Sequence, residues 1–204
     1  SFKSISKLTY IHANTADAWE GEIGKYAPDI IVHTAWQIRE IHGDHALTWK
    51  WNIDGSDNVF DFAFSNAYVD RLIHFSTVAS YGAFPDNTTE HRYTEEEPFR
   101  KTDYLYAEEK RITEEHLKER YEKSDKHTAV SIVRPAAITG PRGRFMRIRF
   151  GLQSALSGTL KQEKSLVYNL VAAMTAWVPV TPKWLRQYIH EDDIAGLVER
   201  LAFG

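Results

Sequence analysis

Short apolar runs alternate with helix-like segments along this chain. Runs of strand length, each followed by polar or turn-forming residues, lie at residues 29–35, 71–77 and 128–133. The first run, Asp29-Ile-Ile-Val-His-Thr-Ala35, is continuous rather than alternating, which predicts a strand buried on both faces of its sheet. Apolar residues at helical spacings predict helices at residues 49–66, 104–121, 145–156 and 192–203.

The order of these elements predicts an α/β fold. Strand and helix alternate as they do in right-handed βαβ units, so we expect a doubly wound parallel sheet with helices on both faces. In such sheets ligands bind at the carboxyl ends of the strands. The segments that directly follow the predicted strands, 34–36, 76–82 and 135–141, are therefore the candidates for a site. The alternation breaks at residues 158–184, which predicts a small, irregular substrate-side region.

Composition and charge exclude several classes of protein. The 25 basic and 28 acidic residues give a net charge of -3, whereas a nucleic-acid-binding protein concentrates positive charge. The absence of cysteine excludes disulfides, thiolate catalysis and cysteine-ligated metal sites. The longest apolar stretch, residues 170–180, is far shorter than the ~20 residues of a membrane-spanning helix. We therefore expect a cytoplasmic protein that binds neither nucleic acid nor membrane.

Tyr106 and Lys110 form the first candidate for chemistry. Four residues apart on a predicted helix, they lie on one face and one turn from each other. A nearby ammonium favours the phenolate and lowers the pKa of a tyrosine from its usual ~10. Such a tyrosine can exchange a proton with a hydroxyl or carbonyl group while a hydride moves. The same spacing also arises in ordinary surface pairs, so the interpretation depends on Thr77, which ends a predicted strand 29 residues before Tyr106.

Together these residues resemble the extended short-chain dehydrogenases, also called the NAD-dependent epimerase/dehydratase family. The family pattern is Ser-Ser/Thr-x-x-x-Tyr-Gly followed by Tyr-x-x-x-Lys, which is similar to Phe75-Ser-Thr-Val-Ala-Ser-Tyr-Gly82 and then Tyr106-Ala-Glu-Glu-Lys110. Further segments resemble the family in the same order along nearly the whole chain, at residues 29–35, 52–59, 134–141 and 186–195. The resemblance implies a Rossmann-like fold for the predicted parallel sheet.

The resemblance also implies an activity and a set of site residues. It implies an epimerase, dehydratase or reductase that uses NAD or NADP on a hydroxyl or carbonyl carbon, either of a nucleotide sugar or of a smaller substrate. The catalytic roles fall on Thr77, Tyr106 and Lys110, with Asn52 supporting their hydrogen bonds. Cofactor contacts fall on Asn14, Thr34, Ala35, Trp36, Ser76, Tyr106, Lys110 and Pro135. Substrate contacts fall on Thr77, Tyr81 and Arg186.

Several of these residues have a second interpretation. Asn52 also suits the N-terminus of a helix, and Arg186 suits a solvated position as well as it suits a diphosphate. The cluster that begins at His190 offers metal-ligand chemistry through Glu191, Asp192 and Asp193. We favour a loop-to-helix junction there, capped by Asp192 or Asp193, because a metal needs further ligands from elsewhere. We therefore expect no metal.

The sequence also departs from the family pattern. The first strand and its Gly-x-x-Gly-x-x-Gly phosphate loop have no counterpart, and residues 8–13 are similar to the third strand. We therefore expect a piece of a longer protein, or one that lacks residues of its natural sequence. Glu109 replaces the usual Ser, on what we expect to be an exposed helix face.

The expected organisation follows from these matches. Residues 1–157 form an N-terminally incomplete NAD(P)-binding domain, residues 158–185 a substrate-side segment, and residues 186–204 a C-terminally incomplete return to the core. The alternative function is a non-catalytic dinucleotide-sensing or scaffold protein on the same fold. The missing glycine loop favours that alternative, whereas the presence of Thr77, Tyr106 and Lys110 favours an enzyme. A homodimer is left open.

Overall fold

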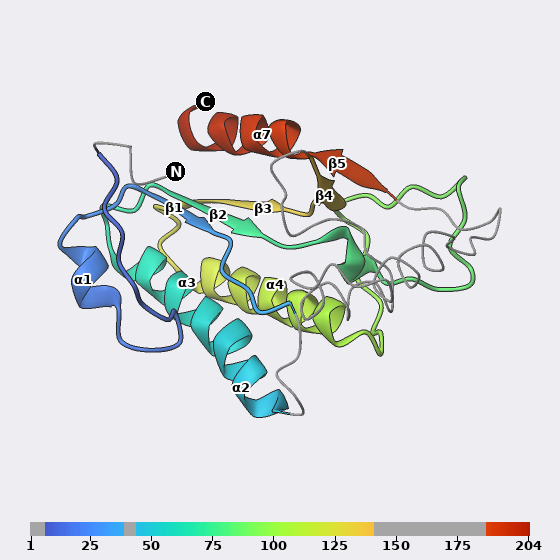
Figure 1. Cartoon of the computed structure of the whole chain (residues 1–204), viewed down its shortest axis with the longest axis horizontal. Helices are drawn as coiled ribbons and strands as arrows, with labels where there is room; N and C mark the ends of the chain where they lie inside the picture. The colour runs from blue at the N-terminus through green and yellow to red at the C-terminus, as the bar shows by residue number, and fades with distance from the viewer. Residues whose placement is uncertain (1–6, 39–43, 141–186) are drawn as a thin grey trace, which may run out of the picture. The chain divides into compact units, whose positions relative to one another are not determined.

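The computed structural model describes residues 7–38, 44–140 and 187–204 (Figure 1). Three strands, β1 (Ile30–His33), β2 (Arg71–Phe75) and β3 (Ala129–Val133), form a parallel sheet in the order β1-β2-β3. In its register Ile30 lies opposite Arg71, and Arg71 lies opposite Ala129. Helices connect each strand to the next, as parallel pairing requires. The predicted α/β fold with a Rossmann-like parallel sheet is confirmed.

Two long helices pack together on one side of this sheet (Figure 1). They are α3 (Gly55–Ser65) and α4 (Leu105–Lys123). In α4, acidic and basic side chains pair one turn apart on the outside, while Ala107 and Leu117 are buried. The main core cluster joins α3, α4 and the sheet through Trp19, Val59, Phe60, Phe62, Ala63, Val69, Leu72 and Leu117. No helix in the described part of the chain has the length and apolar character needed to cross a bilayer.

The helix predicted at 49–66 is longer and more complex than expected. It begins as α2 (His45–Trp49), because the Asp44 side chain accepts a hydrogen bond from Leu47 N at 2.9 Å and caps the first turn. A π-helical turn, η2 (Lys50–Asp54), then precedes α3. π-Turns inside α-helices often occur at functional sites because they turn side chains to new directions.

Gly55, at the start of α3, allows a close approach to the N-terminal segment. A Cβ at this position would lie 2.5 Å from the Thr15 hydroxyl and 3.2 Å from Ala16 N. The glycine of Asn52-Ile-Asp-Gly55 is thus required by packing. On the other side of this contact, Asn14 Oδ1 accepts from Ala16 N at 3.0 Å and closes a tight turn.

The expected strand at residues 8–13 is wrong. None of the described strands pairs with this segment, and a strand is defined by its ladder of hydrogen bonds. A short helix, α1 (Glu20–Gly24), lies between this segment and β1.

The described residues fall into two compact units, one of which contains the parallel sheet and the residues from Leu197 onward. The second unit contains β4 (Ala137–Thr139) and β5 (Tyr188–His190), which pair in parallel with Ala137 opposite Tyr188. Helix α7 (Glu191–Phe203) follows β5. The helix expected at 145–156, the region expected at 158–185 and Arg186 lie outside the described residues.

Candidate active site

Thr77 and Tyr106 come together at the carboxyl end of β2. Thr77 follows this strand and begins a 3-10 turn, η3 (Val78–Tyr81), whose Ala79 N donates to the Thr77 hydroxyl at 3.2 Å. Tyr106 is in the first turn of α4. Burial raises the pKa of Tyr106 above its usual value, and a hydrogen bond with the Thr77 side chain opposes that rise. The structure thus brings the Thr77 and Tyr106 side chains next to each other.

Lys110 lies one turn further along α4 and is almost completely buried, with 3% of its surface exposed. Its Nζ donates to Phe75 O at 2.5 Å and lies 3.6 Å from the centroid of the Trp36 ring. Burial lowers the pKa of Lys110 to about 7, although the carboxylates of Glu114 and Glu109 act in the opposite direction. An amine of this kind changes its protonation state near neutral pH.

The expected lowering of the Tyr106 pKa is not found. Desolvation of the phenol is the largest influence on it, and Lys110 is not among the groups that shift it. The physical reason is the direction of the lysine side chain, whose ammonium contacts the Phe75 carbonyl and the Trp36 ring.

Asn52 lies in the π-turn η2 and is completely buried. Its Oδ1 accepts from Gln37 N at 2.8 Å, and its Nδ2 donates to Gln37 O at 3.0 Å and to Glu109 Oε2 at 2.7 Å. The side chain thus ties the loop after β1 and the helix α4 to η2. It is not at a helix N-terminus, because α2 precedes it in the same helical run.

Glu109 is buried, whereas the sequence suggested that it is exposed. Only 3% of its surface is accessible, because η2 packs against this side of α4 and Asn52 meets the carboxylate. Periodicity within one helix identifies an apolar stripe but does not reveal which polar positions a second helix will cover. The buried carboxylate beside Lys110 is the feature of this site that the sequence reasoning missed.

The Tyr81 hydroxyl is engaged inside the protein. It donates to Thr94 O at 2.9 Å and accepts from Arg134 Nη1 at 2.7 Å, while its ring stacks on Tyr93 with centroids 4.8 Å apart. Arg134 also grips Glu114 with a fork of hydrogen bonds, the shortest being 2.6 Å. Tyr81 thus connects η3 to Arg134 at the end of β3, and Arg134 in turn connects to Glu114 of α4.

Five of the residues expected to contact the cofactor follow the three strands, namely Thr34, Ala35, Trp36, Ser76 and Pro135. Thr34 and Ala35 are exposed after β1, and Ser76 after β2 is buried with no hydrogen-bond partner for its hydroxyl among the described residues. Pro135 follows β3, and its carbonyl accepts from Val78 N at 3.2 Å. The structure thus gathers these positions along one edge of the sheet, as predicted from parallel strands.

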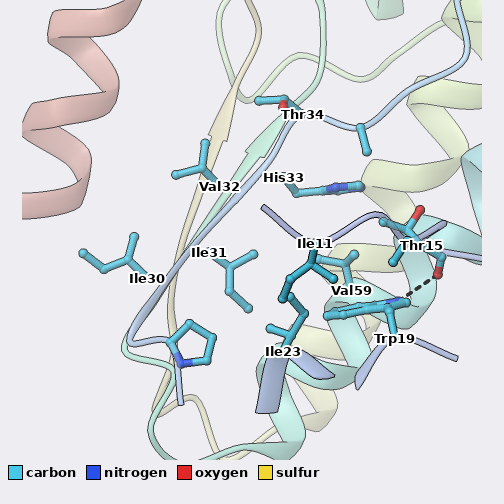
Figure 2. Close-up of a pocket in the computed structure, with 13 residues that line it drawn as sticks. Ile11, Thr15, Trp19, Ile23, Ile30, Ile31, Val32, His33, Thr34 and Val59 are labelled. Atoms are coloured by element: carbon cyan, nitrogen blue, oxygen red, sulfur yellow. Dashed lines mark hydrogen bonds between the residues drawn. The ribbon is translucent and has the colours of Figure 1, made fainter. Parts of the chain in front are cut away.

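A cavity of about 400 Å³ lies beside β1, apart from the Thr77–Tyr106 pair (Figure 2). All four residues of β1 line it, although successive side chains point to opposite faces of the sheet. The cavity therefore runs along the outer edge of the strand and reaches its carboxyl end only at Thr34 and Ala35. Trp19 forms part of the opposite wall and donates from Nε1 to Thr15 O at 3.0 Å (Figure 2).

Beneath the site, His33 connects β1 to η2. The Ser56 hydroxyl donates to Asn52 O at 2.5 Å, so His33 Nε2 carries a hydrogen and donates to Ser56 Oγ at 2.9 Å. Burial lowers the pKa of His33 to about 3 and also lowers that of its neighbour His74, and Lys110 adds to both effects. Both histidines are therefore neutral at physiological pH.

The junction at His190 is a helix start, but it is arranged differently from the expectation. Helix α7 begins at Glu191, and His190 Nδ1 accepts from Asp192 N at 3.2 Å. His190 therefore occupies the position that precedes the helix. Asp192 and Asp193 lie within the first turn, where the helix dipole favours acidic groups. The expectation that one of them caps the helix is therefore wrong. Within the described ranges no group of three or more His, Cys, Asp or Glu side chains could hold a metal ion.

Comparisons with known proteins agree with this fold. A Bordetella bronchiseptica enzyme, WbmH, in complex with NAD+ superposes with a TM-score of 0.69 at 22% identity, over 97% of this chain and 57% of that one. The Bordetella bronchiseptica enzyme WbmG in complex with NAD and UDP gives 0.65 at 22% identity, over 96% and 54%. UDP-glucose 4-epimerase from Thermus thermophilus in complex with NAD gives 0.65 at 21%, over 94% and 59%.

At this level of identity the structural likeness shows the fold, and the chain spans a little over half the length of these structures. Nothing among the curated proteins matches the sequence. The sequence profile described as "NAD dependent epimerase/dehydratase family" matches residues 2–202, almost the whole chain. The chain therefore belongs to the NAD-dependent epimerase/dehydratase family.

Proposed function

We propose that this chain carries the proton-transfer residues of an NAD(P)-dependent epimerase, dehydratase or reductase. The observation that carries the proposal is the interaction of the Thr77 side chain with the Tyr106 phenol, with the buried Lys110 one turn behind the tyrosine. A hydroxyl pair at the carboxyl end of a strand in a parallel sheet is well placed to meet a substrate oxygen. The non-catalytic scaffold has no need for this arrangement.

Tyr106 acts as the general acid or base in this proposal. Its phenol exchanges a proton with the substrate oxygen, and Thr77 orients the phenol through their hydrogen bond. Because burial raises the pKa of Tyr106, the resting phenol is protonated and ready to donate. Lys110 supplies an amine whose pKa of about 7 allows it to hold or release a proton in the same pH range.

The residues present fit the nicotinamide–ribose end of a dinucleotide. An ammonium has three donors, and one from Lys110 goes to Phe75 O on the strand side of the site. Thr34 and Ala35 leave the carboxyl end of β1 open to solvent, next to Trp36. When bound, the nicotinamide ring supplies the hydride acceptor or donor. The structural neighbours were solved with NAD, which supports NAD or NADP as the cofactor of this chain.

A nucleotide sugar is the substrate class that we propose. One neighbour was solved with UDP and another is named a UDP-glucose 4-epimerase. Arg186 is the position expected to contact the diphosphate, since a guanidinium suits phosphate oxygens in charge and shape. A smaller alcohol or carbonyl compound is the other substrate class.

The test is Tyr106→Phe in the natural full-length protein. Activity towards a panel of UDP- and dTDP-sugars, with NAD+ and NADP+, should fall by about 10²–10⁴-fold, the usual cost of losing a positioned proton donor. Tyr104→Phe is the matched control, because Tyr104 is two residues away and 58% exposed. Both variants should melt at the wild-type temperature.

Two outcomes would contradict the proposal. Wild-type rates from a folded Tyr106→Phe protein would remove the acid/base role. Calorimetry that detects no dinucleotide binding to the wild-type protein would favour the non-catalytic scaffold.

A further inference from the structure

A single tryptophan contacts both polar residues of α4 in the candidate active site. Trp36 lies three residues beyond the end of β1, across the sheet edge from α4. Lys110 Nζ lies 3.6 Å from the centroid of its ring, and the Tyr106 ring meets it edge-on at 6.4 Å and 85°. Tyr106 and Lys110 are one helical turn apart, so one indole spans the distance between them.

Among the described residues, this indole makes ring contacts but no hydrogen bond. Trp36 Nε1 is buried, and among the described residues it has no hydrogen-bond partner. A buried indole N–H without an acceptor is unfavourable, so the ring would move if hydrogen bonding governed its position. Lys110 and Tyr106 are the side chains seen to contact the ring in the described part of the chain.

The surroundings of Lys110 show what the indole provides. The Phe75 carbonyl is on one side of the ammonium and the Trp36 face is on the other, and water is almost entirely excluded. The charged or titratable groups that face it are Glu109 and Glu114 on α4 itself, and His33 and His74 from the sheet. Both histidines are neutral, so Trp36 is the group outside α4 that favours the cation by contact with a π face.

We propose that Trp36 is a positioning residue for Lys110: its indole face holds the ammonium against the Phe75 carbonyl, one helical turn from Tyr106, and stabilises the charged form of the lysine where water is excluded. The role of Lys110 in catalysis rests on the proposed function, but the contact itself can be tested without activity. Leucine in place of Trp36 keeps an apolar neighbour and removes the π face. The pKa of Lys110 must then fall further, because one of the influences that favour the ammonium has been lost while desolvation still favours the neutral amine.

The experiment is a pH titration of lysine side chains by NMR in ¹³C-lysine-labelled protein. The Lys110 signal is the one that disappears in Lys110→Met. Trp36→Phe keeps a π face and should keep the pKa of Lys110 close to the wild-type value. Trp36→Leu should lower it by about one pH unit, the shift expected from a desolvated cation–π contact. Trp49→Leu, which changes a half-exposed tryptophan of α2, should leave it unchanged.

A purely structural role for Trp36 makes a different prediction, namely equal pKa values for Lys110 in the Phe and Leu variants. That result, or a rise in the pKa in Trp36→Leu, would overturn the proposal. If Trp36→Leu fails to fold, protein grown with fluorinated tryptophan tests the same point, because fluorine weakens the π face with little change in shape. The pKa of Lys110 should fall as fluorines are added, and a constant value would overturn the proposal. An inactive wild-type protein whose Lys110 pKa still depends on the π face would contradict only the proposed function.

Discussion

His33 on β1 and His74 on β2 lie opposite each other in the parallel register, with ring centroids 5.3 Å apart. Their exposed fractions are 5% and 0%, and within the described residues neither ring nitrogen of His74 has a hydrogen-bond partner. Burial lowers the pKa of His33 from 6.5 to about 3 and lowers that of His74 in the same direction. Acidification should therefore destabilise the fold through these two side chains.

The sign and size of the effect follow from linkage. When the pKa in the folded protein lies below the pKa in the unfolded chain, the unfolded chain binds protons that the folded protein cannot. The free energy of unfolding therefore decreases as the pH is lowered from the unfolded pKa to the folded pKa. For His33 this window runs from 6.5 down to about 3. Each pH unit within it costs about 1.4 kcal/mol, which amounts to about 2 kcal/mol between pH 7 and pH 5. His74 adds a loss of the same sign in the same range.

The assay is urea unfolding at pH 7, 6 and 5 for the wild-type protein and for His74→Leu. Leucine has nearly the volume of histidine and cannot be protonated, so the variant should lose less stability on acidification than the wild type does. His127→Gln is the control, because His127 is near the surface and its pKa is raised by Asp125, mainly through a hydrogen bond. The reasoning is refuted if His74→Leu and the wild type lose the same free energy of unfolding between pH 7 and pH 5.

Two further predictions concern the packing beneath the site. Gly55→Ala should destabilise by roughly 1–3 kcal/mol because its Cβ would meet Thr15, whereas Gly21→Ala, with open space around it, should be neutral or stabilising. Asn52→Ala removes three buried hydrogen bonds and should cost roughly 3 kcal/mol, whereas Asn58→Ala removes one and should cost about 1 kcal/mol. Urea unfolding measures all four variants, and equal losses within either pair would contradict the assignment.

The elements that the sequence predicts well are those with strong local signals. The strand expected at 71–77 is found as Arg71–Phe75, and the helix expected at 104–121 as Leu105–Lys123. Apolar runs and regular charge pairs encode these elements locally. The π-turn η2 has no such local signal, because an extra residue in a helical turn is fixed by what the helix packs against.

The candidate site was predictable in its positions but not in its electrostatics. Spacing, strand ends and the family resemblance made Thr77, Tyr106 and Lys110 candidates, because parallel strands bring their carboxyl ends to one edge. The burial of Glu109 and the contact of Trp36 with Lys110 depend on neighbours that lie far away in the sequence. The raised pKa of Tyr106 and the lowered pKa of Lys110 follow from burial, which spacing along one helix does not reveal.

The low pKa of Lys110 needs an explanation, because two carboxylates on its own helix act to raise it. Each of those carboxylates has another partner. Arg134 grips Glu114 from the end of β3, and Asn52 donates to Glu109 from η2. The negative charge of each carboxylate therefore also interacts with a partner other than the ammonium. Desolvation of the lysine remains the largest influence on the pKa of Lys110. Because these partners come from two different elements, the fold itself keeps the pKa of the amine near neutral, one helical turn from Tyr106.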